Sequence, residues 1–392
     1  MSSDLYRRYR SALAGEPLPL AFVDLDAVDR NLDRLLALAH GKRLRIASKS
    51  VRCPALLQYL TDRGGAAVIG LMTYCAAETK FLAAQGFKDL LLAYPTVQPS
   101  DLQALAHANR VATAAVVVDS PEQVDALSRA AVAALVQIPA VVDVDMSYRP
   151  LEGLHLGVRR SPLRSAEEVV ALARKIQGAP SLRFHGLQAY EAQIAGVTDG
   201  SLLKRLLKSL SRPQVEARRA GLAAALAQAG LAAPLFNGGG TGSVTWAAGE
   251  PALTELTVGS GFLNSYLFDH YRALKLEPAA YFALQVARVP GPGLVTCHGG
   301  GFTASGQAGA DRLPRPALPP GLRLLALEGA GEVQTPLRVP DGTQLSVGDP
   351  VFFRHAKAGE LAEHFNEYLL VRGGRIESRA ATYRGLGHCF LG

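Results

Sequence analysis

A lysine at the end of an apolar segment is the first residue that could carry chemistry. The segment "LRIAS" (44–48) is typical of a buried strand, and Lys49 follows it directly. An unpaired ammonium is costly to bury, so its presence here needs a reason. A desolvated lysine has a lowered pKa, and its neutral amine forms a Schiff base with an aldehyde. The alternative is a surface lysine whose alkyl chain lies on the protein while its charge stays in water.

Two glycine-rich segments lie close together far along the chain. "FNGGGTGSV" (236–244) carries three consecutive glycines and the hydroxyls of Thr241 and Ser243, and "VGSGF" (258–262) follows it. Glycines let backbone N–H groups approach an anion, and the hydroxyls add further donors. Turns are often rich in glycine too, so composition alone does not decide between a turn and an anion site. A phosphate site beside the amine of Lys49 would form a site for pyridoxal 5′-phosphate, which carries both an aldehyde and a phosphate.

The elements that must position these residues form a regular pattern. Short apolar, β-branched segments alternate with helical patterns from about residue 44 to residue 260. Several helical patterns begin at Ser, Thr or Pro and end at Gly, as helix caps require. The alternation predicts βα units around a parallel sheet, and eight units predict a closed (β/α)8 barrel of the TIM type. The predicted strands cover residues 44–48, 66–70, 89–94, 114–119, 138–145, 184–190, 234–238 and 253–259.

A barrel would bring the candidate residues together. In (β/α)8 enzymes the active site lies at the carboxyl ends of the strands, and the loops after the seventh and eighth strands often bind phosphate. Lys49 ends the first strand, and the two glycine-rich segments follow the seventh and eighth. The sixth strand brings Gln188, Tyr190 and Glu191 to the same end, where Tyr190 is either a core aromatic or a contact of the cofactor ring. The loop after the fifth strand carries four candidates for holding a substrate carboxylate, some of which are expected to be solvated surface residues: Arg149, His155, Arg159 and Arg160.

A change of pattern near residue 275 predicts a second domain. Beyond it, short strand-like segments are separated by Gly and Pro turns, and little helix is expected. The expected division is a barrel over residues 18–272, with a lead-in strand and helix at its start, and a smaller all-β domain over residues 273–392. Residues 1–17 are a candidate addition to the second domain. The Pro- and Gly-rich segment 311–321 is expected to be a surface loop.

The composition is that of an ordinary globular protein. Of 392 residues, 48% are hydrophobic and 19% are charged, and no run of about 18 apolar residues predicts a membrane span. No secretory signal is recognisable, so a cytoplasmic location is expected. The net charge is +7, but the basic residues are scattered without interleaved aromatics, which disfavours nucleic-acid binding and favours small anionic ligands. The four cysteines lack disulfide or metal spacing and are expected to be free thiols.

The combination of motifs resembles one family. A lysine closing the first barrel strand, Q-x-Y-E after the sixth, G-G-G-T-G after the seventh, E-L-x-x-G-S after the eighth and a trailing β domain are similar to the D-threonine aldolase and D-serine dehydratase family. That family belongs to the alanine racemase-like enzymes that use pyridoxal 5′-phosphate. The resemblance spans about residues 18–390.

The resemblance implies roles for individual residues. It implies that Lys49 holds the cofactor as a Schiff base, that Tyr190 lies by the pyridine ring, and that the protein is a homodimer. It also implies that three residues of the first glycine-rich segment hold the phosphate: Gly239, Gly240 and Thr241. The expected cofactor contacts are completed by Gln188, Gly259 and Ser260.

The sequence departs from the family at one place. Members commonly carry a divalent metal on a C-terminal His-x-Cys or His-x-Asp pair, and this metal binds the β-hydroxyl of the substrate. Here His355 is retained, but Lys357 stands at the second ligand position, and an ammonium is no metal ligand. The hypothesis is that the charge of Lys357 replaces the metal and polarises a β-hydroxyl or a carboxylate, while His355 acts as acid or base. The alternatives are that both are surface residues, or that His364 or Glu360 rebuilds a metal site with His355.

Three reactions share such a scaffold, and the protein selects which bond at Cα breaks. Aldol cleavage of a β-hydroxy-D-amino acid gives an aldehyde and glycine, dehydration gives a keto acid and ammonia, and racemisation inverts Cα. A metal aids the loss of hydroxide, so the departure at Lys357 disfavours dehydration more than aldol cleavage. No second base of the alanine racemase type is recognisable, so racemisation ranks third. The expected function is aldol cleavage, with dehydration as the alternative; a non-catalytic cofactor-binding protein is a distant alternative that the extra β domain disfavours.

Overall fold

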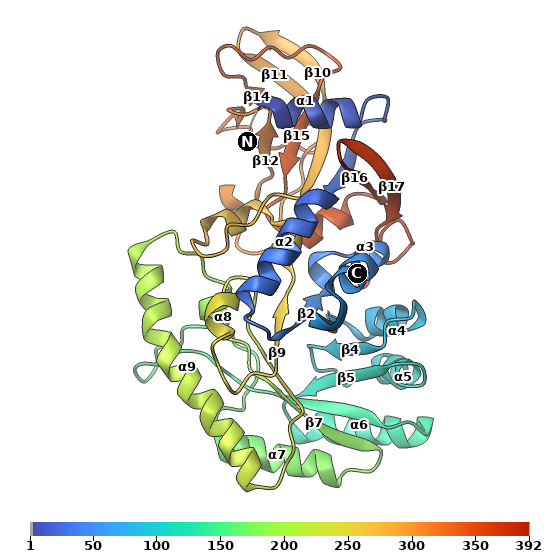
Figure 1. The fold of residues 1–392 in the computed structure, drawn as a ribbon, viewed down its shortest axis with the longest axis vertical. Coiled ribbons are helices and arrows are strands. Elements are labelled where there is room, and N and C mark those ends of the chain that lie inside the picture. Colours follow the sequence, from blue (N-terminus) through green and yellow to red (C-terminus); the bar gives the residue numbers. More distant parts are fainter. Residues whose placement is uncertain (1–2, 392) are drawn as a thin grey trace.

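The computed structural model of the protein describes residues 3–391 and shows a barrel domain joined end to end with a β-rich domain (Figure 1). The barrel closes because its first strand pairs with both its second and its last strand. Each barrel strand overlaps one of the eight predicted segments, so the expected fold class is confirmed. The strands are β2 (Arg43–Ala47), β3 (Val68–Thr73), β4 (Asp89–Leu92), β5 (Thr113–Val118), β6 (Ile138–Asp143), β7 (Leu182–Gln188), β8 (Leu235–Gly238) and β9 (Glu255–Val258).

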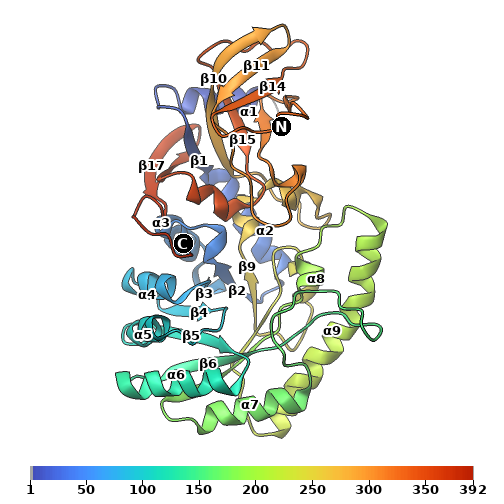
Figure 2. The same ribbon diagram turned by 180° about the vertical axis from the view of Figure 1, so that it is seen from behind.

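Helices cover the outside of the barrel, as Figure 2 shows from behind. Their starts follow local chemistry: the Ser120 hydroxyl accepts from the N–H of Gln123, and Ser165 forms a capping box with Glu168. Within residues 3–391, no helix is long and apolar enough to cross a membrane. The longer barrel helices are α3 (Pro54–Gly64), α4 (Ala76–Ala84), α5 (Pro99–Ala108), α6 (Pro121–Ala134), α7 (Ala166–Gly178) and α9 (Leu202–Gln228), and three single turns at the carboxyl ends are α8 (Ala192–Ala195), α10 (Val244–Ala247) and α11 (Ser260–Leu263).

The second domain is a nine-stranded sheet in which β10 is central. Most of it runs in the order β13-β14-β11-β10-β1-β16-β17, and β15 pairs with β10 and β12. Helix α1 (Ser3–Ala12) packs on this sheet through Tyr9, whose ring lies 4.8 Å from that of Phe22. The strands are β1 (Leu20–Asp24), β10 (Ala280–Gly291), β11 (Leu294–His298), β12 (Arg315–Leu318), β13 (Arg323–Leu324), β14 (Gln334–Arg338), β15 (Pro350–Arg354), β16 (Glu367–Arg372) and β17 (Arg375–Ala381).

Two expectations from the sequence are wrong in this domain. Strand β1, expected to lead into the barrel, instead pairs with β10 and β16 of the second sheet. All five of its residues are buried, and a continuous apolar strand does not reveal which sheet it joins. The segment 311–321, expected to be a surface loop, contains β12, which pairs with β15 and buries Leu318. Its prolines led to the prediction of a loop. An edge strand tolerates proline, however, so the prolines do not exclude a strand.

The second domain reaches the barrel beside Lys49. Helix α2 (Leu25–Leu38) connects the domains, and the 3-10 turn η5 (Ala358–Glu363) packs on the turn η1 (Ser48–Ser50), which follows β2. A Cβ on Gly359 would stand 1.7 Å from the carbonyl oxygen of Lys49. Only glycine allows this close approach, so the second domain contacts the carboxyl end of the first barrel strand through Gly359. The remaining 3-10 turns are η2 (Gly65–Ala67), η3 (Tyr266–His270) and η4 (Ala310–Arg312).

Candidate functional site

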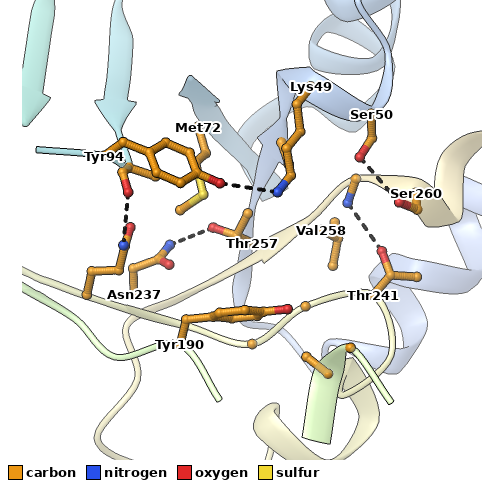
Figure 3. A pocket seen from close by; sticks show the side chains of 18 of the residues that line it. Lys49, Ser50, Met72, Tyr94, Tyr190, Asn237, Thr241, Thr257, Val258 and Ser260 are labelled. Atoms are coloured by element: carbon orange, nitrogen blue, oxygen red, sulfur yellow. Dashed lines mark hydrogen bonds between the residues drawn. The ribbon is translucent and has the colours of Figure 1, made fainter. Parts of the chain in front are cut away.

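A cavity opens at the carboxyl ends of the barrel strands (Figure 3). Its volume is about 180 Å³. The structure brings to its wall all eight residues expected to contact a cofactor: Lys49, Gln188, Tyr190, Gly239, Gly240, Thr241, Gly259 and Ser260.

Lys49 lies in η1, and its side chain is exposed to the cavity. Its Nζ is 3.5 Å from the hydroxyl of Tyr94, a long contact that leaves the amine loosely held (Figure 3). The expectation of a desolvated lysine is therefore wrong. The buried charge of β2 is Arg45, which is 1% exposed and pairs with Glu255 at 2.7 Å and with Asp89 at 2.7 Å. These carboxylates supply the partners that a buried charge requires.

The two glycine-rich segments form neighbouring loops that are bonded to each other. The Oγ1 of Thr241 accepts from the N–H groups of Gly259 and Gly261, each at 3.2 Å. The hydroxyl of Ser260 lies 3.3 Å from that of Ser50, which connects the second loop to η1 (Figure 3). We refer to residues 239–243 and 259–261 together as the loop side of the cavity.

A buried carboxylate accepts hydrogen bonds from the loop side. Glu191 is fully buried, accepts from the N–H of Gly239 at 3.1 Å and from the hydroxyl of Ser243 at 2.6 Å, and pairs with Arg219. Arg219 is itself fully buried and also pairs with Glu250, the pKa of which burial raises to about 7. Paired and hydrogen-bonded charges of this kind fix geometry, so the position of the glycine loop is set before any ligand arrives.

The loop side presents donors that suit a phosphate. The N–H groups of Thr241 and Gly242 donate to no group of the described chain, residues 3–391. A Cβ on Gly240 would stand 2.9 Å from the Cβ of Ala195, so glycine keeps the loop open there. Free backbone N–H groups on a glycine-rich loop are a favourable environment for an anion. The residues present therefore fit the phosphate of pyridoxal 5′-phosphate.

A second buried carboxyl lies behind the cavity at the end of β6. Asp143 accepts from the side-chain amide of Gln188 at 3.1 Å, and the two residues are paired across β6 and β7. Burial raises the pKa of Asp143 to about 7. The Oε1 of Gln188 is buried without a partner in residues 3–391, although Gln188 lines the cavity. Asp143 is not among the residues expected from the sequence, although a carboxylate near the carboxyl end of a predicted barrel strand is a pattern that could have indicated it.

Of the four residues proposed to hold a substrate carboxylate, Arg160 alone lines the cavity. Its guanidinium lies over the rings of Tyr94, at 5.7 Å, and Tyr190, at 5.4 Å. Burial raises the pKa of Tyr190 to about 12, so its phenol stays protonated. The other three lie away from the cavity wall, where Arg149 pairs with Asp145, His155 contacts the carbonyl of Val158 and Arg159 is exposed.

His355 and Lys357 lie in the second domain, outside the cavity wall. The Nδ1 of His355 is 2.6 Å from the carbonyl oxygen of Lys357, and a carbonyl only accepts, so Nδ1 carries the proton. The Nε2 atom is left with a lone pair, is buried and has no partner among residues 3–391. Burial lowers the pKa of His355 and keeps the ring neutral. The half-buried Lys357 donates to the Oγ of Ser305 at 2.9 Å, and burial lowers its pKa as well.

The donor set around His355 does not fit a divalent metal. Its ring centre lies 6.1 Å from that of His364, which stacks instead on Phe302. Glu360 accepts from the backbone N–H and the hydroxyl of Ser305. Over the described part of the chain, no three His, Cys, Asp or Glu side chains are grouped to hold a metal ion. One imidazole nitrogen beside an ammonium is a poor metal site.

The barrel region matches a known protein family. Residues 23–263 match the family described as "Alanine racemase, N-terminal domain". The chain belongs to this family. The family resemblance seen in the sequence is thereby confirmed, and the family implies pyridoxal 5′-phosphate as cofactor.

Two related proteins are aldolases by name. The chain is 28% identical over 371 residues to a D-threonine aldolase of Arthrobacter sp, covering 88% of this chain and 90% of that protein. It is also 28% identical over 255 residues to a 3-hydroxy-D-aspartate aldolase of Paracoccus denitrificans (strain Pd 1222), covering 62% of this chain and 59% of that protein.

Two solved structures share the fold over nearly the whole chain. The D-threonine aldolase from Filomicrobium marinum aligns with a TM-score of 0.82 and 24% identity, covering 94% of this chain and 95% of that one. The D-threo-3-hydroxyaspartate dehydratase from Delftia sp. HT23 aligns with a TM-score of 0.74 and 19% identity, covering 95% and 98%. These likenesses confirm the arrangement of a barrel followed by a β domain.

Proposed function

We propose that the protein is a pyridoxal 5′-phosphate-dependent lyase that cleaves β-hydroxy-D-amino acids to an aldehyde and glycine. The observation that carries this proposal is the cavity, in which the exposed amine of Lys49 shares a wall with Gly239, Gly240 and Thr241, and the backbone N–H of Thr241 has no partner among residues 3–391. An amine and a phosphate site at one barrel mouth match the two functional ends of this cofactor. The names of the two related aldolases point to the same reaction class.

Different residues of the chain are proposed to bind different parts of the cofactor. Lys49 supplies the amine that attaches to the aldehyde, the loop side binds the phosphate, and Tyr190 lies beside the ring. Gln188 offers its free Oε1 to the same space. The cofactor, when bound, supplies the electron sink for the bond that breaks at Cα. The chain selects that bond by orienting the substrate.

Substrate contacts are proposed from the cavity wall and from the second domain, which packs beside it. Arg160 is placed to bind a carboxylate, because its guanidinium lines the cavity and its planar face is supported by two tyrosine rings. On the side of the second domain, Lys357 is proposed to act on the β-hydroxyl or a carboxylate of the substrate through its charge. The bare Nε2 of His355 is proposed to accept or return a proton there.

Dehydration is the second candidate reaction. Loss of the β-hydroxyl as water requires a proton donor near that oxygen, and the ammonium of Lys357, which donates to Ser305, is the proposed donor. The products would be a keto acid and ammonia. Racemisation ranks below both reactions. A non-catalytic cofactor-binding protein remains a distant alternative.

We also propose that the protein is a homodimer. Four leucines lie within one 100° stripe at the start of α9, and an apolar stripe of this kind in water indicates a contact surface. Analytical ultracentrifugation of the wild type and of a Leu203→Asp, Leu206→Asp double variant tests the proposal, since the double variant should be monomeric. A wild-type monomer would contradict it. The leucines and their exposed fractions are Leu202 (78%), Leu203 (76%), Leu206 (55%) and Leu210 (53%).

The proposed function is tested by the visible absorption spectrum of the purified protein, with and without added cofactor. The wild type should show the absorption of a lysine-attached cofactor, and Lys49→Ala should lose it. Lys80→Ala is the matched control, because Lys80 is exposed on α4 away from the cavity. A panel of D- and L-β-hydroxy amino acids is then assayed for aldehyde and glycine, and separately for keto acid and ammonia. A wild-type protein that shows no band after addition of pyridoxal 5′-phosphate would contradict the proposal.

A further inference from the structure

Lys357 is held at the point where the second domain meets the barrel. It directly precedes η5, the turn that packs on η1 and brings Gly359 against the carbonyl of Lys49. Its backbone is therefore held beside η1, on the side of β2, and its charge interacts with that of Lys49. Arg160 enters from the loop after β6, four strands around the eight-stranded barrel and so on the opposite side.

The ammonium of Lys357 is oriented but has no carboxylate partner. Its Nζ donates to the Oγ of Ser305 at 2.9 Å, and it takes part in no ion pair within the described chain. Glu360 accepts from the N–H of Ser305 at 2.8 Å and from its hydroxyl, so this carboxylate is bonded to the serine and not to the lysine. An ammonium has three donors, and two of them remain for a ligand.

The surroundings of Lys357 favour an anion. The group is half-buried, and the charges that act on it include the positive charges of Arg312 and Lys49 as well as the negative charge of Glu360. The Nε of Arg312 is buried and unpartnered in residues 3–391, while its Nη1 pairs with Asp311 at 2.8 Å. A partly desolvated cation close to other cations is stabilised by a carboxylate ligand, and such charge-assisted hydrogen bonds are among the strongest in proteins.

We propose that Lys357 binds a carboxylate on the side chain of the substrate, so that the enzyme prefers β-hydroxy-D-amino acids with an anionic side chain. The inference rests on the proposed function, since it names the substrate class within it. Arg160 on the barrel side and Lys357 on the second-domain side provide two separated cations for a substrate with two carboxylates. Ser305 and Glu360 act as positioning residues that hold the ammonium toward the mouth.

The kinetic test compares two substrates that differ at the side chain, D-3-hydroxyaspartate and D-threonine, in the holoenzyme. Lys357→Met removes the charge and keeps the length of the chain. Its kcat/KM should fall about tenfold to hundredfold for hydroxyaspartate, the value of one charge-assisted hydrogen bond, and less than about threefold for threonine. Lys357→Arg should restore most of the preference in kcat/KM for hydroxyaspartate over threonine. Lys80→Met should leave both kcat/KM values unchanged. An equal loss for both substrates would overturn the proposal, because it would place Lys357 on a group that both share.

A binding test separates this inference from the proposed function. D-malate and D-lactate lack an amino group, so neither can react, and they differ by one carboxylate. In calorimetric titrations of the holoprotein, D-malate should bind at least about tenfold more tightly than D-lactate, and Lys357→Met should abolish the difference. Ser305→Ala should reduce it, because the charge stays but its orientation is lost.

The outcomes of the two tests are distinguishable. If the difference between malate and lactate depends on Lys357 but no β-hydroxy-D-amino acid is cleaved, the proposed function fails and the anion site stands. If D-threonine is cleaved but Lys357→Met binds malate as the wild type does, the proposed function stands and this inference fails. Circular dichroism and the thermal midpoint of each variant establish that a lost preference is not a lost fold.

Discussion

The two sides of the cavity are built in different ways. The loop side rests on Glu191 and Arg219, which are fully buried and bonded to each other and to the glycine loop. The neighbouring side, formed by η1 at the cavity wall and by η5 packed on η1, is here named the lysine side. It carries an exposed Lys49 with one long contact and, before η5, a half-buried Lys357 bonded to a serine. The loop side is held in position by buried charges without a ligand, whereas the lysine side chains of the second side are held by single hydrogen bonds.

The difference follows from what each side has to do. An anchor for one end of a ligand gains affinity when its donors are already in position, because no ordering is needed on binding. An amine that has to reach a ligand needs rotational freedom, and a long alkyl chain at a cavity mouth provides it. Rigidity on the loop side and freedom on the lysine side therefore serve the same site.

The largest effect is expected when the buried carboxylate that bonds the loop side is removed. Glu191→Ala leaves Arg219 buried with only Glu250 as its charged partner and frees the N–H of Gly239. Removing one partner of a buried ion pair should lower the free energy of unfolding by about 3–5 kcal/mol in urea titrations. The exposed Glu328→Ala is the control and should change it by less than about 0.5 kcal/mol. A Glu191 variant as stable as the wild type would mean that the loop side is not held by this network.

The second prediction concerns Asp143, the buried acid at the end of β6. Its raised pKa should make the stability of the protein depend on pH. Its folded pKa of about 7 lies above the ordinary value of 3.8, so folding favours the protonated form. Its contribution to stability is fully present below pH 3.8 and is lost as the pH rises through 7. Asparagine does not titrate, so Asp143→Asn should gain stability relative to the wild type as the pH rises from 4 to 8. The gain should reach about 1–4 kcal/mol, at about 1.4 kcal/mol per pKa unit.

The measurement is the free energy of unfolding in urea at several pH values. Asp341→Asn, at an exposed position, provides the control and should show no such trend. A difference between Asp143→Asn and the wild type that stays constant from pH 4 to pH 8 would contradict the raised pKa.

The sequence predicts the loop side better than the lysine side, for a physical reason. The eight strands and the glycine segments are local patterns, and the closed barrel places all carboxyl ends at one mouth. The choice of Arg160 over its neighbours is not local, because the hydroxyl of Ser161 bonds the carbonyl of Asp143 at 2.7 Å and so directs that loop. The contact of Lys357 with Ser305 joins positions 52 residues apart. The pairing of Arg45 with Glu255 likewise depends on barrel closure.

Gly259→Ala alters the contact between the loop side and the lysine side. An added Cβ would stand 2.7 Å from the Oγ of Ser50 and 2.8 Å from the Cβ of Ala47, so the rigid loop would be pushed away from η1. Overpacking of this kind costs about 1–3 kcal/mol, and we expect at least a tenfold weaker binding of pyridoxine 5′-phosphate in fluorescence titrations. The control is Gly221→Ala, because Gly221 lies within α9 with open space around it. Unchanged binding by Gly259→Ala would show that the loop can move freely against η1.

The smallest effect is expected on the lysine side itself. Tyr94→Phe removes the one hydroxyl that contacts Nζ of Lys49, and that contact is 3.5 Å long. A hydrogen bond at this distance adds little, so the free energy of unfolding should change by less than about 0.5 kcal/mol. The phenyl ring keeps its packing under Arg160, which limits the change further. Urea titration of the ligand-free protein measures the effect. A loss above about 1.5 kcal/mol would place Lys49 in a network as firm as that of Glu191, and the contrast between the two sides would disappear.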